Sequence, residues 1–164
     1  MPRLFIAVWP PEEVAAELAA LHRKDQHGVR FVQPDNWHIT LRFLGEAHPG
    51  DVIAALGDAP LAAARAHLGP AVDVIAERAL VVPVDGLNVL AGQVIDRTKG
   101  IGEPPRKRFV GHLTLARVKS HVPMPRLLGS MVSAEFDVDE IALVQSRRGP
   151  DGVRYETIGT WPVG

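Results

Sequence analysis

The chain has 164 residues, which is long enough to bury one hydrophobic core, and its 46% apolar content predicts a folded globular protein. Its net charge of −1 excludes a protein that coats long nucleic acid by charge alone, although recognition of a nucleic-acid end remains open. The lack of cysteine excludes disulfides and thiolate chemistry. No segment resembles a signal peptide or a membrane span, so we expect a cytoplasmic protein that does not bind a membrane.

The first quarter of the chain predicts two strands separated by a helix. Residues 3–9 alternate as a strand does, and the following helix opens with Pro10-Pro11 and two acidic residues near its positive end. Gly28 is a plausible stop for that helix. A short extended segment at 29–32 and a turn at 33–36 then lead into a half-buried strand at 37–44.

The middle of the chain predicts a broken helix followed by strands. Residues 51–68 are rich in alanine and favour a helix, which Gly57 and Pro60 should interrupt. Strands are predicted at 72–75 and 79–84. Asp85-Gly86 is typical of a hairpin turn, so we expect another strand at 88–94.

The last part of the chain predicts mostly strands. A short helix at 95–99 and a loop at 100–105 precede a strand at 109–118, and residues 122–131 contain proline and give no clear pattern. Segments 136–146 and 153–161 are predicted to pair as a hairpin across Gly149-Pro150-Asp151-Gly152. The order of elements indicates an α+β fold with mostly antiparallel pairing.

A four-residue phrase occurs twice. Residues 38–41 read His-Ile-Thr-Leu, and residues 112–115 read His-Leu-Thr-Leu. In a chain of this composition such a phrase is expected by chance on the order of 0.01 times. Because side chains alternate along a strand, the His and Thr of each phrase share one face. If the two strands lie side by side, two imidazoles and two hydroxyls converge on one place.

These four side chains suit the cleavage of a phosphodiester by water. One group must take a proton from water, and another must give a proton to the departing alkoxide. Histidine suits both tasks because its ordinary pKa of about 6.5 keeps both forms populated. The hydroxyls of Thr40 and Thr114 can donate to the non-bridging phosphate oxygens. This chemistry requires no metal and no other cofactor, so we expect none.

Paired His-x-Thr motifs resemble the 2H phosphoesterase superfamily. The wider context is similar to its RNA 2′,3′-cyclic phosphodiesterase branch, also called bacterial and archaeal 2′-5′ RNA ligases. The segments that carry this resemblance span most of the chain: Arg-Leu-Phe-Ile-Ala-Val at 3–8, Pro-Asp-Asn-Trp-His-Ile-Thr-Leu-Arg-Phe-Leu-Gly at 34–45, His-Leu-Thr-Leu-Ala-Arg-Val at 112–118 and Arg-Tyr-Glu at 154–156.

The resemblance implies a single domain, residues 1–164, made of two pseudo-equivalent lobes in which two antiparallel sheets flank a central cleft and the helices lie outside. It implies hydrolysis of RNA 2′,3′-cyclic phosphate ends to 2′-phosphomonoesters, with 2′-5′ ligation in some members. By the same resemblance His38 is the proton donor, His112 is the proton acceptor, and Thr40 and Thr114 hold the phosphate. The sequence alone does not order the two histidines.

Two features depart from the family pattern. The stretch 93–108 is short where the family usually carries a fuller helix, and Ala91, in the expected strand at 88–94, replaces a frequent aromatic residue. Both departures concern how a nucleotide is held.

Two arginines are candidate contacts to substrate. Arg117 matches a family arginine that can reach the substrate, but in a regular strand it would point away from His112 and Thr114, so the contact requires a bulge or a strand end. Arg42 shares the parity of His38, which leaves it as either a cleft residue or a rim charge.

Other residues are open to two interpretations. Seven of the 18 basic residues fall between Arg97 and Lys119 against the single acid Glu103, which predicts either a positive surface for an RNA end or a solvated loop. Phe5, Trp9 and Tyr155 are candidate base-stacking platforms, with core packing as the alternative for at least two of them. The remaining histidines are expected on the surface without a metal: His22, His27, His48, His67 and His121.

Three functions therefore compete. The first is a metal-independent cyclic phosphodiesterase whose partners are RNA termini or short nucleotides with a cyclic phosphate, acting as a monomer. The second is a 2H hydrolase of another small cyclic or 2′-5′ nucleotide. The third is an RNA-end binding module without turnover, against which the intact His and Thr of both motifs argue, because binding alone needs no proton-transfer groups.

Overall fold

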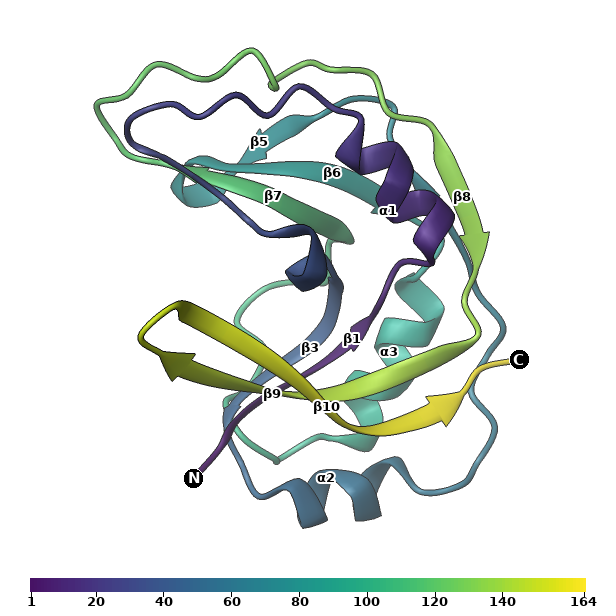
Figure 1. Cartoon of the computed structure of the whole chain (residues 1–164). Coiled ribbons are helices and arrows are strands. Elements are labelled where there is room, and N and C mark those ends of the chain that lie inside the picture. Colours follow the sequence, from purple (N-terminus) through teal and green to yellow (C-terminus); the bar gives the residue numbers. More distant parts are fainter.

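The computed structural model describes all 164 residues and shows an α+β fold built on a curved antiparallel sheet (Figure 1). The strands are β1 (Arg3–Val8), β2 (Val29–Phe31), β3 (Ile39–Glu46), β4 (Arg65–Leu68), β5 (Asp73–Ile75), β6 (Ala79–Asp85), β7 (His112–Val118), β8 (Ala134–Asp137), β9 (Glu140–Gly149) and β10 (Gly152–Pro162). The helices are α1 (Glu12–Ala19), α2 (Pro49–Leu56) and α3 (Asn88–Arg97), with short 3₁₀ turns at Pro34–Asn36 and Ala76–Arg78. None of these helices could span a membrane.

The sheet has two halves that meet at one residue pair. The strand order is β10-β9-β1-β3-β7-β6-β4-β8, with β2 added beside β7 and β5 beside β6, and every pairing is antiparallel. Between β3 and β7 only Ile39 and Leu113 pair. The two predicted sheets are therefore joined at a single point, and the strands diverge on either side of it (Figure 1). The predicted α+β class is confirmed.

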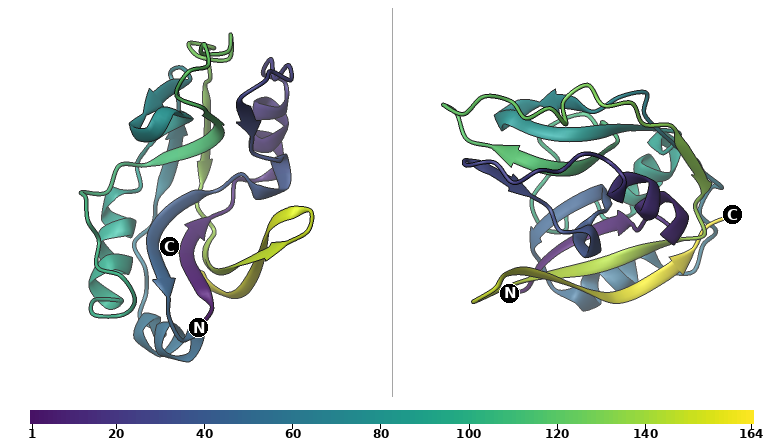
Figure 2. Two further views of the ribbon diagram at one scale, coloured as in Figure 1. Left: turned by 90° about the vertical axis from the view of Figure 1, so that its left-hand side faces the viewer. Right: turned by 45° about the horizontal axis from the view of Figure 1, so that its top comes forward.

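The core extends through both halves. A cluster of 33 buried apolar residues includes Leu4 and Ile6 of β1, Leu113 and Leu115 of β7, and Trp37. The helices cover different parts of the sheet, since α3 packs against β3 and α1 packs against β8, and Figure 2 shows α1 and α3 on opposite sides of the central strands. Each fully buried leucine or isoleucine contributes about 1.5–3 kcal/mol to holding the strands together.

The strand predicted at 88–94 is wrong, because these residues form most of α3. Leu87, Leu90, Ala91 and Val94 are all buried, and their spacing follows one face of a helix. The Asp85-Gly86 turn therefore leads into a helix and not into a hairpin. Ala91 lies on the buried face of this helix, and the short helix predicted at 95–99 is its last turn.

Two further boundaries differ from the prediction. The helix predicted over 51–68 is confirmed only as α2, which ends before Gly57, while Arg65–Leu68 is the strand β4 between β6 and β8. Pairing on both edges overrides the helical preference of alanine there. The segment 136–146 divides between β8 and β9, and the hairpin predicted around 149–152 is confirmed as β9–β10.

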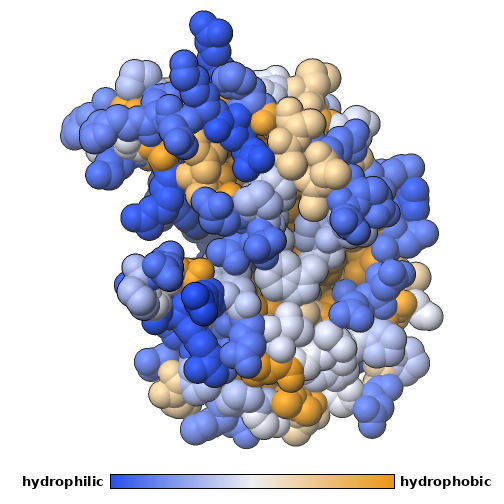
Figure 3. Space-filling model, viewed as in Figure 1, coloured by the Kyte–Doolittle hydropathy of each residue, from blue (hydrophilic) through white to orange (hydrophobic).

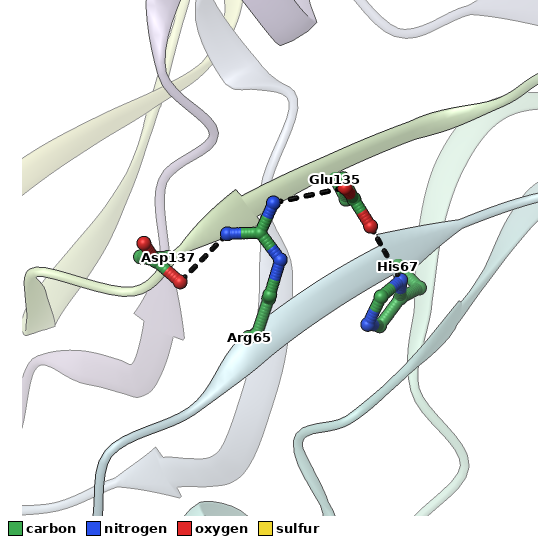
Figure 4. A network of polar contacts seen from close by, with 4 residues as sticks. All are labelled: Arg65, His67, Glu135 and Asp137. Atoms are coloured by element: carbon green, nitrogen blue, oxygen red, sulfur yellow. Dashed lines mark hydrogen bonds and ion pairs between the residues drawn. The ribbon is translucent and has the colours of Figure 1, made fainter.

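A surface network of charges links β4 to β8 at the outer end of the sheet (Figure 4). The Arg65 guanidinium contacts Glu135 at 2.9 Å and Asp137 at 2.7 Å, and Nδ1 of His67 lies 3.0 Å from the other carboxylate oxygen of Glu135. The neighbouring Arg65 holds the pKa of Glu135 below its usual range. These basic side chains thus have acidic partners.

Candidate active site

The two His-x-Thr motifs meet where β3 joins β7. Ile39 opposes Leu113 in an antiparallel pair, so the His and Thr of each motif flank the point at which the two strands meet. These four side chains line one pocket of about 570 Å³, together with Arg117. The structure therefore brings all five predicted site residues to one place.

Both histidine rings are held in the same way. Nδ1 of His38 lies 2.7 Å from the carbonyl oxygen of Asn36, and Nδ1 of His112 lies 2.8 Å from the carbonyl oxygen of Val110. A carbonyl oxygen can only accept, so each Nδ1 carries a proton and donates it. Nε2 is therefore the proton-transfer atom of each ring, and at His38 it accepts from the Thr40 hydroxyl at 3.0 Å in the neutral form. In both motifs the carbonyl comes from the second residue before the histidine.

Aromatic side chains surround the His38 ring. Its centroid lies 4.8 Å from that of Phe5, 5.3 Å from that of Tyr155 and 5.7 Å from that of Trp9, while its Nε2 lies 3.0 Å from Oγ1 of Thr40. Burial among these groups lowers the pKa of His38, and nearby His112 lowers it further, whereas the hydrogen bond to Asn36 acts in the opposite direction. The ligand-free protein therefore favours the neutral ring at His38.

The three aromatic residues that were candidate stacking platforms pack around this ring. Phe5 is buried, and Trp9 and Tyr155 pack against the small cluster to which Phe5 belongs. The Trp9 indole donates to Oγ1 of Thr157 at 3.1 Å. Burial raises the pKa of Tyr155, with nearby Arg117 acting against that change. These contacts favour the packing interpretation of Phe5.

A β-bulge in each motif strand decides which arginine reaches the pocket. The register of β7 against β6 skips Leu115, and the register of β3 against β1 skips Leu41. An extra residue moves the following side chains to the other face of the strand. Arg117 therefore lies on the pocket side with Thr114, which the predicted contact required. The corresponding change of face turns Arg42 inward.

Arg42 has a structural role, so its interpretation as a rim charge is wrong, although it also borders a pocket that Thr40 and His112 line. Its side chain is only 4% exposed. It donates to the carbonyl oxygens of Phe43, Ile101 and Glu103 at 2.9, 2.9 and 2.7 Å, and to Oγ1 of Thr98 at 3.3 Å. Arg42 thereby ties the loop after α3 to β3.

The pocket contains polar residues that the sequence reasoning missed. Arg3 of β1, Ser146 and Arg148 of β9 all line it, and Arg3 pairs directly with Ser146. No alternation marks them in the sequence, because β9 passes from four consecutive buried residues into exposed ones. No acidic side chain lines the pocket, so the charges of its arginines are well suited to an anionic ligand. Figure 3 shows a hollow at the left edge of the molecule between hydrophilic lips.

The other predicted basic residues divide between structural and surface positions. Arg97 donates to the carbonyl oxygens of Leu56, Ala59 and Pro60, so it holds the segment after α2. Arg106 and Lys107 line a second pocket that shares Thr40 and His112 with the first. The remaining five histidines are exposed, and no group of three or more His, Asp or Glu side chains is placed to hold a metal ion.

Comparisons with known proteins agree with this geometry. The family model described as LigT like Phosphoesterase matches residues 8–70. An RNA 2′,3′-cyclic phosphodiesterase of Thermus thermophilus is 31% identical over 95% of this chain and 87% of its own length. The corresponding protein of Methanocaldococcus jannaschii is 25% identical over 97% of this chain and 99% of its own.

Solved structures share the fold. A crystal structure from Thermus thermophilus has a TM-score of 0.79 and 30% identity, covering 98% of this chain and 97% of that one. The structure of E. coli LigT complexed with 3′-AMP also has a TM-score of 0.79, covering 99% of this chain and 98% of that one. Its identity of 24% supports a common fold alone.

Proposed function

Because the chain belongs to the LigT-like phosphoesterase family, which includes the RNA 2′,3′-cyclic phosphodiesterases, we propose that it hydrolyses the 2′,3′-cyclic phosphate at an RNA end to a 2′-phosphomonoester. The observation that carries this proposal is the convergence of two His-Thr pairs in one pocket that has no acidic side chain. Each ring has its Nδ1 committed to a backbone carbonyl, so two Nε2 atoms remain for one substrate.

The proposed reaction is a single displacement at phosphorus. The hydroxyls of Thr40 and Thr114 and the guanidinium of Arg117 hold the non-bridging oxygens. Nε2 of His112 takes a proton from water as its oxygen bonds to phosphorus. The bond from phosphorus to the 3′ oxygen breaks, and Nε2 of His38 gives its proton to that oxygen. The phosphate stays on the 2′ oxygen, and the proton gained at one ring balances the proton lost at the other.

The environment of His38 disfavours the protonated ring that a general acid needs. Burial lowers the pKa of His38 and favours the neutral ring, whereas an acid must start protonated. A cyclic phosphate anion beside Nε2 favours the imidazolium, because an opposite charge within about 4–6 Å stabilises the charged form. We therefore propose that the substrate itself charges His38 when it binds.

The same pair of rings can also serve ligation. In ligation a 5′ hydroxyl takes the place of water: Nε2 of His112 accepts its proton as its oxygen bonds to phosphorus, the bond from phosphorus to the 3′ oxygen breaks, and Nε2 of His38 gives its proton to that oxygen, which leaves a 2′-5′ linkage. We include 2′-5′ ligase activity in the proposal on this ground. We also propose that the protein acts as a monomer, because one chain supplies both motifs.

The test is an assay of an RNA oligonucleotide ending in 2′,3′-cyclic phosphate, with EDTA present. We expect a 2′-phosphate product. His38→Ala and His112→Ala should each lower kcat by about 10²–10⁴-fold, since that is the contribution of a positioned acid or base. The exposed His48→Ala serves as the matched control, and melting curves should show that all three variants fold.

The outcomes separate the competing functions. Turnover that disappears with EDTA contradicts the metal-free mechanism. A 3′-phosphate product contradicts the proposed roles of the leaving oxygen and of His38. Tight binding without turnover supports the end-binding module, and turnover of cyclic mononucleotides or 2′-5′ oligonucleotides alone supports another 2H hydrolase.

A further inference from the structure

A further basic pocket, separate from the one that Arg106 and Lys107 line, adjoins the candidate active site. It has a volume of about 460 Å³, and its walls come from β2, β7 and the segments next to them. Arg117 lines both this pocket and the candidate active site. The side chains around it are basic or neutral, with no carboxylate: His27, Gly28, Val29, Arg30, Arg117, Val118 and Lys119.

The sheet geometry places three cations on the same face. Arg30 pairs directly with Arg117 across β2 and β7, so both side chains project from one side. Lys119 comes two residues after Arg117, at a backbone spacing of about 6.6 Å, and therefore follows the same side. The backbone N–H of Lys119 donates to the carbonyl oxygen of Gly28 at 2.9 Å, which continues the pairing.

These charges have no partners within the protein. Arg30, Arg117 and Lys119 are exposed, and none of them lies within 4.0 Å of an acidic oxygen in an ion pair. Like charges directly opposite each other across two strands destabilise the strand pairing. The pairing of Arg30 with Arg117 therefore opposes folding, whereas Arg65 in the charge network of Figure 4 is compensated.

We propose that Arg30 and Lys119 extend the active site as a track for the phosphodiester chain of the RNA. The inference rests on the proposed function, because the terminal phosphate in the first pocket fixes where the chain starts. The next phosphates then pass Arg117 and reach Arg30 and Lys119. The ligand class follows from the chemistry, since a row of unpaired cations beginning at a phosphate site fits a polyanion attached to that phosphate. The enzyme should therefore prefer an oligonucleotide to a cyclic mononucleotide.

Salt dependence tests this track. Each phosphate contact on single-stranded nucleic acid contributes about −0.7 to the slope of log affinity against log salt concentration. For wild type, kcat/KM on a cyclic-phosphate oligonucleotide should depend on salt more steeply than kcat/KM on a cyclic mononucleotide. In the double variant Arg30→Gln/Lys119→Gln the oligonucleotide slope should flatten by about 1.4.

The substrate preference gives a second readout. The ratio of kcat/KM for the oligonucleotide to kcat/KM for the mononucleotide should fall about tenfold at low salt in the double variant, mainly through KM, and the loss should shrink about sevenfold between 50 and 200 mM salt. The matched control is Lys99→Gln, an exposed lysine outside both pockets, which should leave the ratio unchanged. The melting temperature of Arg30→Gln should not fall, because a repulsive pair is removed.

The failure of the track is distinguishable from the failure of the proposed function. An unchanged ratio and slope in the double variant, with wild type active, overturn the track and leave the hydrolase intact. If wild type hydrolyses neither substrate, the track can still be tested by measuring the binding of a fluorescent oligonucleotide with a 2′-phosphate end. Weaker, less salt-dependent binding by the double variant supports the track, and equal binding overturns it.

Discussion

At the scale of single residues, the arrangement that matters is the pair of hydrogen bonds that fix the imidazoles. Asn36 and Val110 each offer a backbone carbonyl to the Nδ1 of the histidine two residues later. The sequence identified both histidines because the motif occurs twice, but it could not identify these partners, because any residue type has a carbonyl. It also could not predict the pKa of His38, which depends on Phe5 and Tyr155 from distant strands.

The pH dependence of the rate follows from this residue. If His38 is the acid, the alkaline limb of kcat/KM reports its pKa in the free enzyme, and activity is lost as pH rises through that value. Because burial lowers this pKa, the limb should lie below the ordinary value of about 6.5. In kcat, which reports the complex, the limb should move to higher pH because the bound phosphate anion favours the charged ring.

A variant with a less buried His38 ring can be compared with wild type to test whether burial sets the alkaline limb. Trp9→Ala removes an aromatic side chain next to the ring and should raise the alkaline limb of kcat/KM towards the ordinary value. In His38→Ala the residual activity should lose its alkaline limb. Loss of the acidic limb instead means that His38 is the base and that the two roles are exchanged.

At the scale of elements, the bulges at Leu41 and Leu115 explain most of what the sequence could not predict about the site. Alternation predicts correctly that His and Thr of each motif share a face, and it fails for Arg42, which lies beyond the extra residue. A bulge has no clear signature in these apolar segments. The strand predicted where α3 lies is wrong for a different reason. The spacing of the buried residues indicates a helix, but the Asp85-Gly86 turn favoured a hairpin and was given more weight.

Because of the bulges, Arg42 lies in the core and should affect stability, whereas Arg117 lies at the pocket and should affect activity. Arg42→Leu should lower the free energy of unfolding by about 2–4 kcal/mol, because it leaves the carbonyl oxygens that Arg42 bonds without a donor. Urea unfolding measures this change. Arg117→Leu should leave that free energy within about 0.5 kcal/mol of wild type, while lowering kcat/KM on the order of 10²-fold.

Equal effects of the two substitutions on stability would contradict the assignment of Arg42 to the core. Full activity of Arg117→Leu would contradict its contact with the phosphate. Because both residues are arginines placed after a bulge, each variant is the control for the other.

At the scale of the whole molecule, the antiparallel sheet joins its halves at the pair Ile39–Leu113, the centre of both motifs. The α+β class was predictable from the order of elements, and the convergence of the motifs from their repetition. The distribution of charge was not, because a net charge of −1 conceals a pocket lined by Arg3, Arg117 and Arg148 with no acidic side chain. Folding alone brings these arginines together from β1, β7 and β9.

The central claim is that two imidazoles from distant parts of the chain act on one phosphorus. A crystal structure of the complex with adenosine 2′-monophosphate tests it most directly. The account predicts that Nε2 of His38 and Nε2 of His112 both lie about 3 Å from oxygens of the same phosphate, with Thr40 and Thr114 donating to it. A phosphate that contacts one ring only, or that binds outside this pocket, would contradict it.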